Sequence, residues 1–96
     1  MRLMLKFTVP VEKGNQAVQD GTMGRTIDEL IEQTKPEASY FMVEQGKRAG
    51  LIFFELADPS ELPKINEPLF AKLDAAVEIV PVLNRGDLRR SLSTSV

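Results

Sequence analysis

The sequence lacks three residue types that carry much of protein chemistry. It contains no cysteine, no histidine and no tryptophan. The absence of cysteine excludes disulfides, thiolate metal sites and thiol nucleophiles within this chain. The absence of histidine removes the only side chain with an unperturbed pKa between about 5 and 8, and with it the commonest ligand of transition metals. We therefore expect no metal site and no cofactor, and any chemistry must come from carboxylates, lysines, arginines, tyrosine and hydroxyls.

Long hydrophobic runs and a large net charge are also absent. No apolar segment approaches the roughly 20 residues of a membrane span. The start, MRLMLKFTVPVEKG, is too short and too soon polar for a signal peptide. The formal net charge is −2, so no summed positive field would attract nucleic acid or an anionic membrane. We expect a cytoplasmic protein with neither nucleic acid nor membrane among its partners.

What is present describes a small globular domain. The chain has 96 residues, of which 43% are hydrophobic and 27% charged, a balance typical of neither disordered nor membrane-embedded chains. A chain of this length buries only about 60% of the surface that it exposes when unfolded, so a partner subunit would help to stabilise it. We expect a single domain over residues 1–96, with a short terminal helix capped by Asn84 and a tail at about 84–96.

Periodicity predicts a strand and a helix in the first third of the chain. Apolar and polar residues alternate from Arg2 to Val9, which predicts a strand. Helical spacing then runs from Glu12 to Thr34. Gly21 and Gly24 indicate a kink or a close approach to the sheet. A restart of the helix near Thr26 is the alternative, because Thr26 has the spacing of a capping box.

The middle of the chain contains a hairpin. Two β-rich runs from Glu37 to Leu56 are joined across Gln45–Arg48, with Gly46 at the first central position of a type II′ turn. Counting outward from that turn pairs Tyr40 with Phe53.

A second helix and a last strand follow the hairpin. Ser60 has the position of an N-cap in the run DPSELP. Pro68 should kink the helix or restart it, with Asn66 as the new cap. A fourth strand is predicted from Ala76 to Leu83.

Strand, helix, hairpin, helix, strand is the ferredoxin-like βαββαβ order of an α+β protein. It gives a four-stranded antiparallel sheet with strand order 4-1-3-2 and both helices on one face. We assign the helices to the flank without charges, which carries Leu3, Leu5, Phe7, Phe41, Val43, Ile52, Phe54, Val77 and Ile79. The other side, which we call the open sheet face, then carries Met4, Lys6, Thr8, Tyr40, Met42, Leu51, Phe53, Glu55, Glu78, Val80 and Val82.

The open sheet face is too apolar for a surface left in water. Tyr40 and Phe53 can each bury roughly 150–250 Å², and with their neighbours they form a patch typical of an interface or a ligand cleft. We expect a face-to-face homodimer. The alternative is that the tail around Leu88 and Leu92 folds across the patch. The predicted dimer interface consists of Met4, Tyr40, Met42, Leu51, Phe53, Val80 and Val82.

Nearly the whole chain resembles the dimeric α+β barrel group, through segments such as FTVPVEKGN, KPEASYF, GLIFFEL and VEIVPV. That group includes the muconolactone isomerases, the YciI-like proteins and the cofactor-free monooxygenases. More narrowly, the chain is similar to small bacterial proteins of unassigned function. The resemblance implies two sheets packed into a closed barrel and, as in some members of the group, a pocket between the open sheet face and the helices or tail. The His-Asp pair of YciI-like proteins cannot exist here, because the chain has no histidine.

Two pairs of charged residues point to the open sheet face from neighbouring strands. Lys6 and Glu78 can lie opposite or diagonal, and Arg2 and Glu55 form a similar pair nearer the other end. In a functional interpretation, a carboxylate partly desolvated among aromatic rings has a raised pKa and moves a proton, while Lys6 steadies an enolate or carboxylate ligand. In a structural interpretation, the pairs are cross-strand or intersubunit ion pairs. The candidate catalytic residues are Glu78, Glu55 and Lys6.

Tyr40 and Phe53 complete the candidate ligand site. The Tyr40 hydroxyl can donate a hydrogen bond to a ligand, or the ring can simply pack against Phe53. The expected ligand-binding residues are Lys6, Tyr40, Phe53 and Glu78, with no metal ligand among them.

Three functions remain open. The first is a small homodimeric protein that binds a small organic molecule, such as a carboxylated one, on the open sheet face. The second is a cofactor-independent isomerase or oxygenase with Glu78 or Glu55 as its base. The third is a dimerisation module with no ligand. A cavity beside Lys6 and Glu78 would favour the first two, and a dry, filled interface would favour the third.

Overall fold

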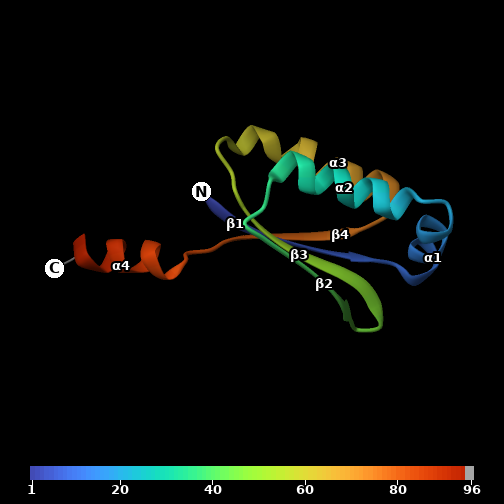
Figure 1. Ribbon diagram of the computed structural model, residues 1–96, viewed down its shortest axis with the longest axis horizontal. Helices are drawn as coiled ribbons and strands as arrows, with labels where there is room; N and C mark the ends of the chain where they lie inside the picture. The colour runs from blue at the N-terminus through green and yellow to red at the C-terminus, as the bar shows by residue number, and fades with distance from the viewer. Residues whose placement is uncertain (95–96) are drawn as a thin grey trace.

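The central strand of the sheet is β1 (Arg2–Val9), as the computed structural model of residues 1–94 shows (Figure 1). β1 pairs antiparallel with β3 (Lys47–Glu55) on one side and with β4 (Ala76–Pro81) on the other. β2 (Ala38–Glu44) lies outside β3, so the strand order is β2-β3-β1-β4. This is the predicted 4-1-3-2 order, counted from the opposite edge, and it confirms the ferredoxin-like α+β architecture. The alternate residues of β1 are all buried: Leu3, Leu5, Phe7 and Val9.

Two helices follow β1 where the sequence predicted one helix with a kink or a restart. They are α1 (Val11–Gln19) and α2 (Thr22–Thr34). Gly21 separates them with a φ of 83°, a left-handed conformation that glycine adopts without steric cost. The restart near Thr26 is wrong, because Thr26 is buried inside α2. Gly24 makes no close approach, since no neighbouring atom of the described residues lies within 4 Å of the place that a Cβ would occupy there.

The second helical region is a short 3₁₀ turn, η1 (Pro59–Glu61), followed by α3 (Leu62–Leu73). Its cap is Asp58 rather than the predicted Ser60, because the Asp58 Oδ1 atom accepts a hydrogen bond from the Ser60 N–H at 3.0 Å. No restart occurs at Pro68, which lies inside α3. The buried side chains on both sides of this proline hold the helix against the sheet: Ile65, Leu69 and Leu73.

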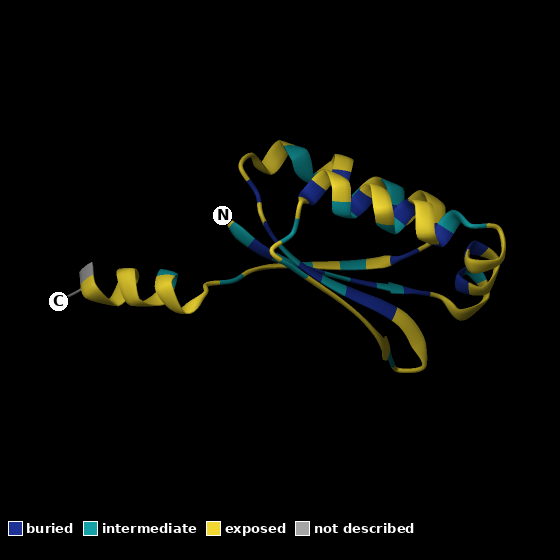
Figure 2. Cartoon of the chain, viewed as in Figure 1, coloured by how far each residue is buried: buried dark blue, intermediate teal, exposed yellow. Residues whose placement is uncertain are grey.

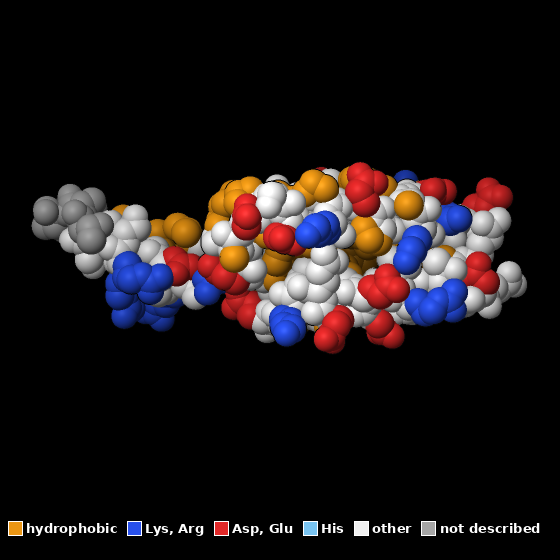
Figure 3. All heavy atoms as spheres, turned by 90° about the horizontal axis from the view of Figure 1, so that it is seen from above, with side chains coloured by type: hydrophobic (Ala, Val, Ile, Leu, Met, Phe, Trp, Pro, Cys, Tyr) orange, Lys and Arg blue, Asp and Glu red, His pale blue; other side chains and the backbone are white. Residues whose placement is uncertain are grey.

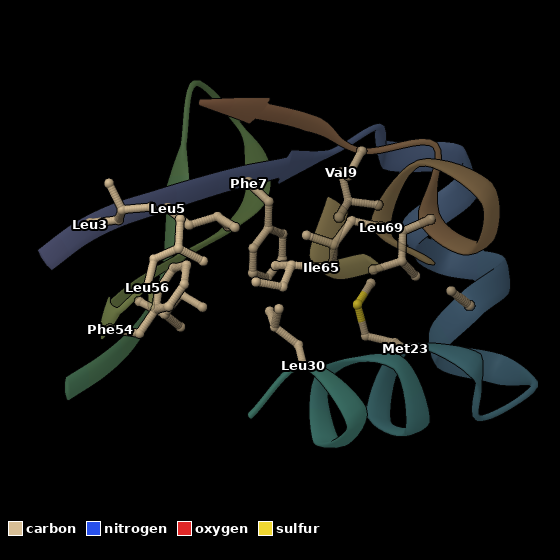
Figure 4. Close-up of a cluster of buried hydrophobic side chains, with 14 residues drawn as sticks. Leu3, Leu5, Phe7, Val9, Met23, Leu30, Phe54, Leu56, Ile65 and Leu69 are labelled. Carbon is tan, nitrogen blue, oxygen red and sulfur yellow. The ribbon is translucent and has the colours of Figure 1, made fainter. Parts of the chain in front are cut away.

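The hydrophobic core lies between one face of the sheet and the helices α2 and α3, as predicted (Figure 1). In Figure 4 the Phe7 ring points into this space, toward Leu30 of α2 and Ile65 of α3. Val77 and Ile79 of β4 pack against the core from the edge. The core therefore draws on β1, β3, β4 and the helices.

The outer strand β2 contributes nothing to this core. Phe41 and Val43 were expected beneath the helices, but 54% of Phe41 and 76% of Val43 are exposed. That expectation is wrong, because the helical layer packs on β1, β3 and β4 and does not extend over β2. β2 is exposed along nearly its whole length (Figure 2).

The hairpin turn differs from the predicted type II′ turn. Gln45 and Gly46 both have positive φ, 50° and 79°, which is the geometry of a type I′ turn centred on these two residues. Tyr40 therefore pairs with Leu51, and the predicted pairing with Phe53 is wrong by two residues. The face assignments survive, because side chains alternate with a period of two and a shift of two leaves each residue on the same face.

The C-terminal helix α4 (Arg85–Thr94) projects beyond the end of the sheet (Figure 1). The predicted cap is confirmed: the Asn84 Oδ1 atom accepts a hydrogen bond from the Asp87 N–H at 2.7 Å. β4 ends at Pro81 and not at Leu83. The alternative in which the tail covers the open sheet face is wrong for the part of the chain described, because α4 lies off that face with Leu88 exposed.

Gly50 allows Phe7 to lie flat against β3, and we predict that Gly50→Ala destabilises the protein. A Cβ at this position would lie 2.5 Å from the Phe7 Cε1 atom, and Phe7 is only 2% exposed, so its ring has no room to move. Overpacking of this kind costs about 1–3 kcal/mol. Urea denaturation curves measure the effect.

The matched control is Gly24→Ala. Gly24 lies in α2 with open space around it, so alanine there should leave stability unchanged or raise it by up to about 1 kcal/mol. A Gly50→Ala variant at least as stable as the wild type would contradict the packing described for Phe7.

Candidate functional site

The open sheet face is arranged in rows, because the four strands are in register. The first row is wholly apolar and consists of Ala38, Phe53, Met4 and Val80. The second consists of Tyr40, Leu51, Lys6 and Glu78. The third consists of Met42, Ala49, Thr8 and Ala76. The predicted face assignment is therefore confirmed across all four strands.

Several large apolar side chains of this face are exposed. Tyr40 is 60% exposed, Val80 44% and Met42 37%. Met4, Leu51 and Phe53 are half-buried between them. None of these side chains is covered by another element of residues 1–94, because α2 and α3 lie on the opposite face and α4 projects past the sheet (Figure 1).

Lys6 forms its ion pair with Glu44 and not with the predicted Glu78. The Lys6 Nζ atom lies 2.5 Å from a Glu44 carboxylate oxygen. Glu78 is opposite Lys6 in the register, as predicted, but it has no ion pair within residues 1–94. The hydrogen bond to Glu44 raises the pKa of Lys6, and the charges of Glu44 and Glu78 add to that effect. Sequence reasoning missed Glu44, although its even position in β2 already placed it on the open sheet face.

Arg2 also has partners other than the predicted one. Glu55 is opposite Arg2 in the register, but its carboxylate accepts a hydrogen bond from the N-terminal ammonium of Met1 at 2.9 Å. The Arg2 Nε atom instead donates to Glu37 at 2.7 Å, and its Nη1 atom donates to Asp87 at 2.5 Å. Arg2 thereby ties the central strand to the segment before β2 and to the first turn of α4.

Asp87 is the most heavily bonded carboxylate of this region. It accepts hydrogen bonds from Arg2, from Arg90 and from the Asn84 N–H. The Asn84 backbone hydrogen bond, followed by the positive charges of Arg2 and Arg90, holds the pKa of Asp87 below its usual range. Basic side chains gather on α4 around this point (Figure 3). The N-terminal end of α4 is therefore held to the sheet by charge.

Two hollows lie at opposite ends of the open sheet face, and they separate the predicted ligand residues. The first, of about 250 Å³, lies beside the hairpin turn and contains Lys6 and Glu78. The second, of about 520 Å³, contains Tyr40 and Phe53. We call the second the aromatic hollow, and its lining is Arg2, Glu37, Ala38, Tyr40, Phe53, Val82, Leu83 and Asn84.

The carboxylates proposed as a catalytic base are not desolvated by the aromatic rings. Glu78 is exposed on the edge strand β4, and the side chain of Glu55 is 68% exposed beside the N-terminus. Within residues 1–94 no three acidic side chains gather closely enough to hold a metal ion. No helix of the same residues is long and apolar enough to cross a membrane.

Comparisons with known proteins add little to this geometry. No protein-family model and no curated protein matches the chain. Among solved structures, it is similar to a de novo designed protein, Ferredog-Diesel, with 17% sequence identity, a TM-score of 0.43 and coverage of 83% of this chain and 82% of that one. The fold described above stands on its own strand order and register. The resemblance to the dimeric α+β barrel group stays a prediction.

We predict that acid releases α4 from the sheet. Because the pKa of Asp87 is lowered in the folded protein, its stabilising contribution is present above the ordinary Asp value of about 3.9 and is lost as pH falls through the lowered value. Asp87→Asn should loosen α4 already at pH 7. Amide chemical shifts of Arg85–Leu88, followed by NMR during a pH titration, measure both effects.

Asp58→Asn provides the control, because Asp58 also has a lowered pKa but caps η1 far from α4. It should leave the α4 signals unchanged. Identical α4 shifts in the wild type and the Asp87→Asn variant at pH 7 would show that this carboxylate does not hold the helix.

Proposed function

We propose that this protein acts as a homodimer in which two open sheet faces pack together and enclose a small, mainly apolar organic molecule in the aromatic hollow. The observation that carries the proposal is the set of exposed apolar side chains in the three rows of that face: Tyr40, Met42 and Val80. Exposed apolar patches of this kind commonly serve as interfaces or ligand clefts.

The charges at the two ends of the open sheet face favour a second copy as its occupant. Arg2 and Glu55 lie at one end, and Glu44 and Lys47 lie at the other. Each end of the face thus carries a positive and a negative charge. In a two-fold arrangement the same patch faces itself, and neither end carries a surplus of one sign that would repel the second copy.

The aromatic hollow is the better candidate for the ligand. Its volume of about 520 Å³ lies within the range of about 300–1,000 Å³ typical of small-molecule sites. The Tyr40 hydroxyl and the Asn84 amide can orient a ligand by hydrogen bonds. Ala38, Phe53, Val82 and Leu83 supply apolar parts of the wall, and the ion-paired Arg2 and Glu37 complete it.

A carboxylated ligand, which the sequence suggested, gains no support from the charges. The Lys6 ammonium is paired with Glu44, and the Arg2 guanidinium is paired with Glu37 and Asp87. A ligand carboxylate would have to displace one of these partners. We therefore propose a neutral, mainly apolar ligand. The isomerase or oxygenase alternative gains no support, because Glu78 and Glu55 are exposed.

We predict that Phe53→Asp halves the mass of the particle in solution. A carboxylate in the first apolar row would be buried without a partner in the face-to-face dimer, which is costly. Multi-angle light scattering at micromolar concentration measures the mass, and circular dichroism verifies that the variant is folded. Val80→Lys, at an exposed position of the same row, should give the same result with less risk to the fold.

The control is Phe70→Asp. Phe70 is 42% exposed on α3, in the helical layer on the other side of the sheet, so its replacement should not change the mass. Equal masses for the wild type, Phe53→Asp and Val80→Lys would contradict the face-to-face dimer.

We further predict that the neutral dye N-phenyl-1-naphthylamine binds in the aromatic hollow. The chain has one tyrosine and no tryptophan, so Tyr40 is the one energy donor, and substitutions in the wall of the hollow locate the bound dye. Leu83→Arg should weaken dye binding at least tenfold by placing a charge in the wall. Val18→Arg, at an exposed site on α1, is the control. Absence of energy transfer in the wild type would favour the dimerisation module without a ligand.

A further inference from the structure

The two edges of the sheet differ in how they are protected. The edge strand β4 carries Glu78 and ends at Pro81, and charged residues and proline are the usual devices that prevent an edge from pairing with another chain. The opposite edge strand, β2, has neither between Ala38 and Val43. Its outer edge has no pairing partner within residues 1–94.

β2 is also apolar on both of its faces. Tyr40 and Met42 are exposed on the open sheet face, and Phe41 and Val43 are exposed on the helix side. A free edge with apolar side chains on both sides is a template for strand addition, because a new strand gains backbone hydrogen bonds and apolar contacts together.

The hairpin determines which backbone groups of β2 are free. In a hairpin closed by a two-residue turn, the residues beside the turn, here Glu44 and Lys47, exchange hydrogen bonds, and every second residue does so beyond them. The even residues of β2 therefore bond to β3. Glu37, which precedes β2, departs from this alternation, because its N–H also bonds to the Phe53 carbonyl at 2.8 Å; the regular pattern therefore begins at Ala38. The N–H and C=O groups of the odd residues, Ser39, Phe41 and Val43, point outward.

We propose that β2 pairs antiparallel with β2 of a second copy, with the two Phe41 residues opposite each other at the two-fold axis. In this register Ser39 lies opposite Val43 of the other copy, so all three outward-facing residues exchange hydrogen bonds with outward-facing partners. The two sheets then form one continuous sheet.

The side chains of β2 are self-complementary in this register. On the helix side the two Phe41 rings meet, and aromatic cross-strand pairs are among the stabilising ones. On the open sheet face Tyr40 lies opposite Met42, a favourable contact between sulfur and an aromatic ring.

Charges do not oppose the pairing. Glu44 lies opposite Ala38, and Glu37 lies opposite Gln45, so no two like charges face each other. Glu44 is in addition paired with Lys6 of its own chain. This self-complementarity identifies a second copy of the chain, rather than an unrelated strand, as the occupant of the edge.

Hydrogen exchange of the purified protein tests the proposal, because the two sets of β2 amides have different partners. In the wild type, the amides of Ser39, Phe41 and Val43 should be protected at least tenfold more than in Val43→Lys, which places a charge on the edge. The amides of Tyr40 and Met42, which bond to β3, should stay protected in both proteins. Exchange of the odd amides at the rate of unstructured peptide in the wild type would overturn the proposal, whether the edge is open or reserved for another protein.

Ser39→Pro tests the same contact with the backbone, since proline removes an outward N–H and none that bonds to β3. It should halve the mass measured by light scattering, as Val43→Lys should. Ser39→Ala and Val18→Lys are the matched controls and should retain the wild-type mass. An unchanged mass for both edge variants would overturn the proposal.

This inference is independent of the face-to-face dimer, and one cross-comparison separates them. Phe53→Asp removes the face contact but leaves the edge intact, so the odd amides of β2 should stay protected in that variant. Loss of mass in Phe53→Asp with retained protection supports both contacts. Protection without any effect of Phe53→Asp on mass supports the edge alone, and loss of mass without protection supports the face alone.

Discussion

Packing of one face of β1 against α2 and α3 is the constraint on which the rest of the structure depends. β1 is paired on both sides, so neither of its edges is free, and its alternate residues are buried down to the last one before Pro10. Both covering helices lie on the same side. Within residues 1–94, no helix therefore covers the other face of the sheet. The open sheet face is a direct consequence of how the core is closed.

The charged residues of the open sheet face are largely satisfied within the chain. Lys6 has Glu44, Arg2 has Glu37 and Asp87, and Glu55 has the N-terminal ammonium. Apart from charged groups such as Glu78, what residues 1–94 leave without a partner is apolar: the exposed side chains around Tyr40 on the open sheet face, and both faces of the edge strand β2. Association driven by apolar burial fits this distribution better than recognition of a charged ligand does.

The two proposed contacts use different parts of the same strand. Face-to-face packing depends on side chains that stand perpendicular to the sheet, whereas edge pairing depends mainly on backbone groups that lie in its plane. Both contacts can therefore form at the same time. A chain with two different two-fold contacts can form a closed assembly larger than a dimer.

Local pattern alone was enough to determine the strand and helix order, the strand order of the sheet and the face on which each strand residue lies. This holds because the face of a strand residue depends only on whether its number is odd or even. The predicted hairpin register was wrong by two residues, and so Tyr40 and Phe53 stayed on the correct face. Tertiary structure decided the rest. The turn type at Gln45 and Gly46, the exposure of Phe41 and the ion-pair partners of Lys6 and Arg2 depend on distances between segments far apart in the chain. Asp87 pairs with Arg2 only because the end of β4 places α4 beside the start of β1. No periodicity in the sequence predicts that ion pair.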